Sequence, residues 1–225
     1  MKLPLLLLLA AATVLAAEPN EVQQRLQDSA SVFSEIMAAP DKGIPQELLE
    51  KAQCVVIVPG MKKGAFIIGG KYGKGFITCR RTTGRGWSAP GAIRVEGGSF
   101  GFQIGGSETD VVMLVMNQRG AQKLLESQFT LGGEGEVAGG PVGRHTSAQT
   151  DAKMQAEILS WSRSRGVFAG LSLQGATLRQ DLDDNTKLYG KPLTNRYIVD
   201  HRIAAPAAAS RLLSLLGRYS PHKGA

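Results

Sequence analysis

Apolar positions near the start of the chain recur with the spacing of an amphipathic helix. Over residues 21–37 the apolar side chains fall on one face, and glutamine and acidic side chains fall on the other. This period of about 3.6 residues predicts a helix, and Pro40 and Gly43 predict where it ends. A second, short helix is expected over residues 45–52, because proline favours the first helical position.

The pattern then changes to short apolar runs that contain many β-branched residues. The first run covers residues 54–58, and Pro59 and Gly60 predict its end. Residues 69–75, with four glycines, are expected to form a turn region. Further runs occur at 65–68, 76–80, 93–95, 100–104, 111–116, 156–161 and 167–173. Runs spaced by roughly ten residues and separated by turn signals predict an antiparallel sheet.

Glycine shapes this prediction, since 21 of the 28 glycines lie between Gly60 and Gly143. Glycine inside strands permits the bulges and bends that a curled sheet needs. Helical patterns return at 120–128, 180–189 and in a leucine-rich tail at about 204–219. We therefore predict an α+β fold: a curled antiparallel β-sheet or small Gly-rich barrel, packed by N-terminal and C-terminal amphipathic helices.

The first 17 residues have the pattern of a secretory signal peptide. Lys2 precedes an apolar run that ends in the small residues Ala16 and Ala17. A bilayer span needs ~20 apolar residues, so an uncleaved membrane anchor is the weaker alternative. Cleavage would leave residues 18–225, expected to form a single domain in the periplasm or outside the cell. No cysteine lies near the cut to accept a lipid.

The two cysteines and three histidines of the chain offer little for metal chemistry. No metal site and no cofactor are expected. Cys54 and Cys79 could form a disulfide in an oxidising compartment, or they could remain two buried thiols. Their separation of 25 residues does not decide between the two.

Positive charge is concentrated in one part of the chain. The formal net charge is +7, and nine basic residues but no acidic residue lie between Lys51 and Val95. Such a cluster attracts anions, and the anions that an exported protein meets include phospholipid head groups. The residues expected to contact head groups are Lys62, Lys63, Lys71, Lys74, Arg80, Arg81 and Arg85. Solvated charges on edge strands and turns are the alternative. Nucleic acid is not expected as a partner of an exported protein.

Apolar side chains of the two terminal helices could extend such a contact into a membrane. Phe33, Ile36, Leu212 and Leu216 lie on the apolar arcs of these helices. The alternative is that these arcs pack on the protein core.

A catalytic interpretation rests on one motif. Residues 97–101 match G-x-S-x-G, with Ser99 as the nucleophile of a serine hydrolase and Asp110 and His145 following in order. That mechanism requires a strand, a tight turn carrying the serine, and a helix. The sequence after Ser99 alternates like a strand instead, so no enzymatic activity is expected.

Several of these segments together resemble the SYLF domain family. They include GGKYGKG (69–75), GSFGFQIG (98–105) and SRSRGVFAG (162–170), with further matches at 44–49, 54–59, 87–90, 139–144 and 189–190. The resemblance covers about residues 31–190. It implies a non-catalytic lipid-binding domain whose N-terminal amphipathic helix helps membrane association. Some members regulate actin, but export would make actin an unlikely partner here. A structural or protein-interaction role in the cell envelope is the alternative, with its protein partner unknown.

Processing of the first residues can be tested directly. When the chain is expressed with its own start in a bacterial host that exports proteins, we expect cleavage after Ala16 or Ala17. The intact mass of the purified protein identifies the new N-terminus. A mass that includes residues 1–17, with the protein in the membrane fraction, would support the uncleaved anchor.

Overall fold

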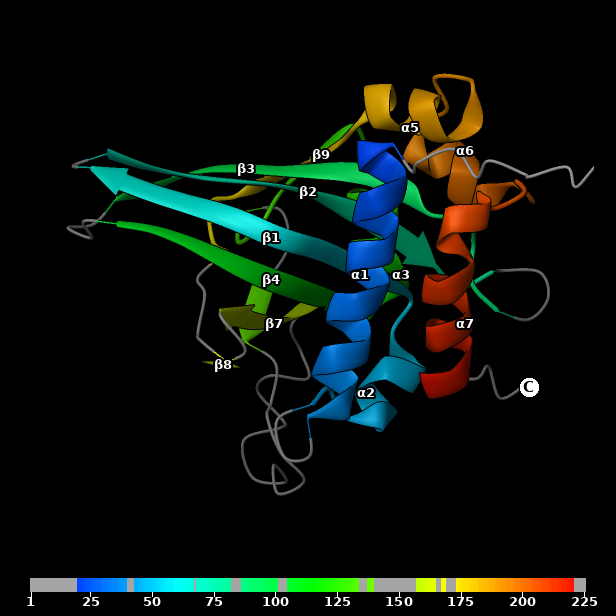
Figure 1. Cartoon of the computed structure of the whole chain (residues 1–225), viewed down its shortest axis with the longest axis horizontal. Helices are drawn as coiled ribbons and strands as arrows, with labels where there is room; N and C mark the ends of the chain where they lie inside the picture. Colours follow the sequence, from blue (N-terminus) through cyan, green and yellow to red (C-terminus); the bar gives the residue numbers. More distant parts are fainter. Residues whose placement is uncertain are drawn as a thin grey trace, which may run out of the picture.

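Four long antiparallel strands form the centre of a curled sheet (Figure 1). The computed structural model describes residues 20–39, 43–66, 68–81, 86–100, 105–133, 137–139, 157–164, 167–168 and 173–220. The predicted signal segment, Arg85 and His145 therefore lie outside the described residues. The strands are β1 Cys54–Phe66, β2 Ile68–Cys79, β3 Gly91–Phe100, β4 Gly105–Val115, β5 Gln128–Thr130, β6 Val137–Gly139, β7 Ile158–Ser164, β8 Val167–Phe168 and β9 Thr177–Gln180.

Within the described residues these segments join one nine-stranded sheet. Its order is β5-β9-β3-β2-β1-β4-β7-β6, and β8 pairs with β7. Every pair is antiparallel except β6 with β7. The prediction of an α+β fold built on a curled, mainly antiparallel sheet is confirmed.

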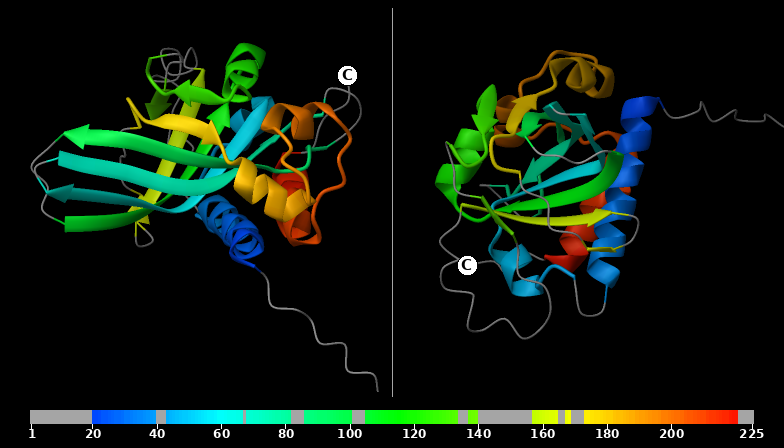
Figure 2. Two further views of the ribbon diagram at one scale, coloured as in Figure 1. Left: turned by 90° about the horizontal axis from the view of Figure 1, so that it is seen from above. Right: turned by 90° about the vertical axis from the view of Figure 1, so that its left-hand side faces the viewer.

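Helices cover both faces of the sheet near one end. They are α1 Glu21–Ala38, α2 Gln46–Lys51, α3 Gln118–Leu124, α5 Leu182–Tyr189, α6 Asn195–Asp200 and α7 Ser210–Tyr219, with a short 3-10 turn at Ala207–Ala209. In the end-on view of Figure 2, α1 and α7 lie on one side of the sheet and α3 on the other. Among the described helices, none is long and apolar enough to cross a bilayer.

Two apolar cores result, one on each face of the sheet. The first contains Phe33 of α1, Leu216 of α7 and inward residues of the strands, such as Ile57 and Phe76. The second lies between the opposite sheet face, α3 and β5. The sheet is thus a shared layer, and alternate residues of each central strand belong to different cores.

The predicted end of a strand at Pro59 and Gly60 is wrong, because β1 continues through both residues. The pairing of β1 with β4 shifts register between Val58 and Met61, which is the mark of a β-bulge. Gly60 has φ of 56° there, a value that suits glycine, and its N–H donates to Asp110 Oδ1 at 3.0 Å. The bulge absorbs a sequence that would otherwise stop a strand.

The glycine-rich segment 69–75 is also strand rather than turn. It is the middle of β2, paired with β1 on one side and β3 on the other. At Gly75 a side chain is excluded, because a Cβ built there would lie 2.0 Å from the Ile57 carbonyl oxygen. The lack of a side chain therefore allows β2 to pass close to the β1 bulge.

Cys54 and Cys79 face each other across β1 and β2 and form a disulfide. Both residues are buried in the second core. Of the two alternatives, a disulfide or two buried thiols, the structure contains the disulfide.

The far halves of β1 to β4 extend beyond α1 (Figure 1). Two rows of directly paired residues cross these four strands, Glu108-Lys62-Tyr72-Glu96 and then Gly106-Gly64-Gly70-Gly98. Residues two apart in a strand share a face, so both rows lie on the face of the sheet that carries α1. We call this surface the projecting face. Tyr72 is 47% exposed on it.

Substitutions of glycines in β2 test the close approach of β2 to the β1 bulge. Gly75→Ala places a methyl group against backbone atoms, 2.0 Å from the Ile57 oxygen and 2.8 Å from Val58 Cα. We expect it to lower the free energy of unfolding by about 3 kcal/mol in urea titrations. The control is Gly70→Ala in the same strand, where a Cβ meets no atom within 4 Å. Equal effects of the two substitutions would contradict the packing described here.

Candidate functional site

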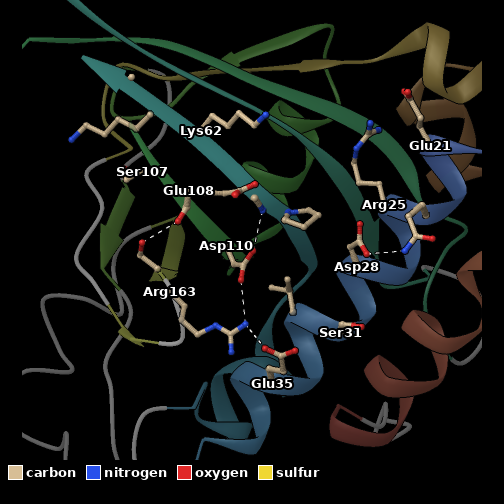
Figure 3. Close-up of a pocket in the computed structure, with 17 residues that line it drawn as sticks. Glu21, Arg25, Asp28, Ser31, Glu35, Lys62, Ser107, Glu108, Asp110 and Arg163 are labelled. Carbon is tan, nitrogen blue, oxygen red and sulfur yellow. Dashed lines mark hydrogen bonds and ion pairs between the residues drawn. The ribbon is translucent and has the colours of Figure 1, made fainter. Parts of the chain in front are cut away.

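A polar groove runs between α1 and the strands β1, β4 and β7 (Figure 3). Its volume is about 1340 Å³, larger than the ~300–1,000 Å³ of ordinary small-molecule pockets. The lining side chains that are apolar are Val32 and Pro59. The full lining is Glu21, Gln24, Arg25, Asp28, Ser31, Val32, Glu35, Pro59, Gly60, Lys62, Lys63, Gly64, Ser107, Glu108, Asp110, Arg163 and Ser164. Charged and polar residues thus outnumber apolar ones in the lining.

The helical wall of the groove is one polar stripe of α1. It consists of Glu21, Gln24, Asp28, Ser31 and Glu35, which follow one another at intervals of three and four residues and so share a face. The helix begins at Asn20, whose side chain caps it in a reciprocal pairing with Gln23. The same helix therefore has one face in the core and another in the groove.

An ion-pair network closes one end of the groove. Arg163 of β7 pairs with Glu35 of α1 and, at 3.2 Å, with Asp110 of β4, as the dashed lines in Figure 3 show. Asp110 also accepts the Gly60 N–H. The network ties α1 to the sheet, and its two carboxylates share one guanidinium.

A second network lies at the other end of α1. Asp184 is buried and receives Arg25 of α1 at 2.7 Å and Lys74 of β2 at 3.1 Å, and Lys74 also reaches Asp181 at 2.7 Å. Burial alone would raise the pKa of Asp184, but the Lys74 ammonium and the Arg25 guanidinium hold that pKa below its usual range. This cluster binds α1 and α5 to the same strand.

Four charged side chains of the groove remain without a charge partner among the described residues. Glu21, Glu108 and Lys62 take part in no side-chain bond there, and Asp28 accepts a hydrogen bond only from the neutral Gln24. Such charges are free to meet a ligand. The acidic ones were not predicted from the sequence, although the seven-residue spacing of Glu21, Asp28 and Glu35 is visible in it.

The basic residues predicted to bind head groups are not gathered on one surface. Lys62 is exposed on the projecting face. Lys63 and Lys71 are neighbours in the register of β1 and β2, on the opposite face of the sheet. Lys71 is only 7% exposed; burial and the nearby Lys63 ammonium lower its pKa. Lys74 is neutralised by aspartates from another part of the chain.

Arg80 has a structural role instead. Its guanidinium donates to the carbonyl oxygens of Leu49 and Glu50 at the end of α2 and to that of Ser220 after α7. It also lies 4.5 Å from the ring centre of Trp87. Arg81 is exposed beside it, at the other end of β2, roughly 30 Å from Lys71 at 3.3 Å per residue. The predicted cluster therefore does not form one attractive surface.

The four side chains predicted to contact a membrane are core residues. Phe33, Ile36, Leu212 and Leu216 are 0–1% exposed and pack together where α1 and α7 meet the sheet. The structure agrees with the alternative, in which these side chains pack in the core, and does not support their contact with a lipid.

Ser99 does not lie on a nucleophile elbow. It is part of strand β3, where it pairs with Gly69 of β2, and no helix begins at it. The G-x-S-x-G match is therefore a property of a glycine-rich strand.

Comparison with known proteins identifies relatives of the chain. Residues 96–219, from β3 to the end of α7, match the Ysc84 family, described as "Las17-binding protein actin regulator". "SH3 domain-containing YSC84-like protein 1" of Xenopus laevis is 31% identical over 209 residues, 90% of this chain and 62% of that protein. "Protein YSC84" of Saccharomyces cerevisiae is 34% identical over 179 residues, 78% of this chain and 38% of that protein. The chain thus spans less than two thirds of these relatives.

These matches confirm the SYLF resemblance and correct the predicted partner. The family description names actin and a protein, Las17, and no lipid, and another yeast relative is called "LAS seventeen-binding protein 3". The prediction of an anionic phospholipid partner and the exclusion of actin are therefore wrong for this family. The family description names a regulator, and one yeast relative is named as a binding protein, in agreement with a non-enzymatic domain.

The Asp184 cluster gives a pH-dependent prediction. The pKa of Asp184 is lower in the folded protein than its ordinary value of about 4, so its ion pairs stabilise the fold fully above about pH 4. This stabilisation of the fold is lost as the pH falls through the lowered pKa. Asp184→Asn should lower the free energy of unfolding by about 2 kcal/mol at pH 7. This is less than for a fully buried ion pair, because Arg25 and Lys74 are partly exposed. Urea unfolding at pH 7 and pH 2.5 measures this.

At pH 2.5 the difference in the free energy of unfolding between the wild-type protein and Asp184→Asn should be smaller than at pH 7. Asp183→Asn, the exposed neighbour in α5, is the control and should change little at either pH. A deficit of Asp184→Asn that is the same at both pH values would contradict an ion-pair role.

Proposed function

Because the chain belongs to the Ysc84 family, we propose that it is a non-catalytic protein-binding domain of the actin-regulator type. Its binding surface is the groove beside α1 together with the projecting face. The observation that carries the proposal is that the described residues leave this surface uncovered, while four of its charged side chains have no charge partner among them: Glu21, Asp28, Glu108 and Lys62. Actin, which the family description names, is the first partner to test.

The size and polarity of the surface support a macromolecular partner. The groove is partly open to solvent, and most of the residues that line it are charged or polar. Small-molecule sites are instead enclosed and mostly apolar. Protein interfaces place a few buried anchors within a polar rim, and the charged rows around this groove resemble such a rim.

Tyr72 is the candidate anchor. Its side chain stands exposed between Lys62 and Glu96 of the neighbouring strands. The next row contains Gly64, Gly70 and Gly98, which have open space above them. A partner can therefore lie flat on the sheet and cover the ring, and tyrosine is enriched among residues that dominate binding energy.

Co-sedimentation with filamentous actin tests the proposal. We expect the purified protein to pellet with filaments and Tyr72→Ala to weaken this at least tenfold, which is about 1.4 kcal/mol. The matched control is Tyr197→Ala in α6, since Tyr197 is 44% exposed and lies outside the proposed surface. Purified components make the assay independent of the predicted export.

Two results would count against the proposal. The first is a protein that stays in the supernatant at every filament concentration. The second is equal weakening by Tyr72→Ala and Tyr197→Ala, because that would place the binding surface elsewhere.

A further inference from the structure

We propose that the groove binds a basic, extended segment of the partner protein. The proposal rests on the proposed function, whose surface it shares, and adds the chemistry of what lies in the groove. Lysine or arginine side chains of that segment pair with Glu21 and Asp28 on α1 and with Glu108 on β4.

The unpaired charged side chains of the groove are mostly acidic. The lining has four cations. Arg25 is paired with Asp184 outside the groove, and Arg163 with Glu35 and Asp110 inside it. Lys63 follows Lys62 in β1, so its side chain lies on the other face of the sheet. The side chains left without a charge partner in the described part of the chain are three carboxylates and one ammonium, those of Glu21, Asp28, Glu108 and Lys62. The groove thus offers a net negative charge although the chain as a whole is positive.

These carboxylates lie on facing walls. Glu21 and Asp28 come from α1, and Glu108 comes from β4 on the sheet side, as Figure 3 shows. A cationic segment between the walls would meet opposite charges on both sides. An acidic segment would meet like charges, which cost several kcal/mol at an interface.

The length of the groove suits an extended segment. The α1 stripe from Glu21 to Glu35 is about 21 Å long at 1.5 Å per residue. About six residues of an extended chain span that length.

The spacing of the acids sets the expected spacing of the bases. Glu21 and Asp28 are two helical turns apart, about 10.5 Å along the axis. In a chain extended as polyproline II, residues three positions apart share a face and lie about 9 Å apart. A segment with two basic residues three positions apart therefore matches the α1 wall.

The test is an NMR titration with two synthetic peptides. One has two lysines three positions apart in an alanine–serine background, and the other has glutamates at the same positions. We expect the lysine peptide to shift the amide signals of residues 21–28 and 108, and the glutamate peptide to cause no change there. Raising the salt from 0.05 to 0.5 M should weaken binding.

Variants make the test specific. The double substitution Glu21→Gln with Asp28→Asn should lower the affinity for the lysine peptide at least tenfold. Glu126→Gln with Asp183→Asn, two exposed acids outside the groove, should leave binding within twofold. Glu21→Lys with Asp28→Lys should bind the glutamate peptide instead, a gain that misfolding cannot produce.

The outcomes separate this inference from the proposed function. Equal binding of both peptides, or shifts that map away from α1, would overturn the basic-segment proposal. If Glu21→Gln with Asp28→Asn still pellets with actin at wild-type affinity, the protein-binding function stands and this inference fails. If the lysine peptide binds the groove while actin does not pellet the protein, the inference stands and the actin partner is wrong.

Discussion

The position of α1 depends on ion pairs at its two ends, and the carboxylate at one end, Asp184, is buried. Asp184 receives Arg25 and Lys74 at one end, and Arg163 joins Glu35 to Asp110 at the other. Breaking a buried ion pair leaves an unpaired charge and costs more than the pair contributes. These two networks, with the apolar face of the helix in the core, fix which side of α1 faces the groove.

The opposite end of the sheet has a different constraint. Four glycines in register, Gly106, Gly64, Gly70 and Gly98, leave the projecting face without side chains in one row. This row offers no side chains on which a helix could pack, so β1 to β4 can extend past α1. Helix and strands then enclose the groove on two sides and leave its third side open to a partner.

The sequence predicted the helices that have clear 3.6-residue periods, and α1 begins at the predicted residue. It did not predict strands through Pro59–Gly60 or through residues 69–75, because local turn propensity was overruled by pairing with strands on both sides. Side-chain roles were harder still. Lys74 and Arg80 looked like surface cations, yet the aspartates and carbonyl groups that engage them come from segments far away in the sequence.

The central claim is that a protein partner covers α1 and the projecting face. Hydrogen–deuterium exchange of the protein, alone and with filamentous actin, tests this most directly because it reports on every described segment at once. The account predicts slower exchange in α1 and in the far halves of β1, β2 and β4 on binding. Slower exchange confined to α5 and α6, with α1 unchanged, would contradict it.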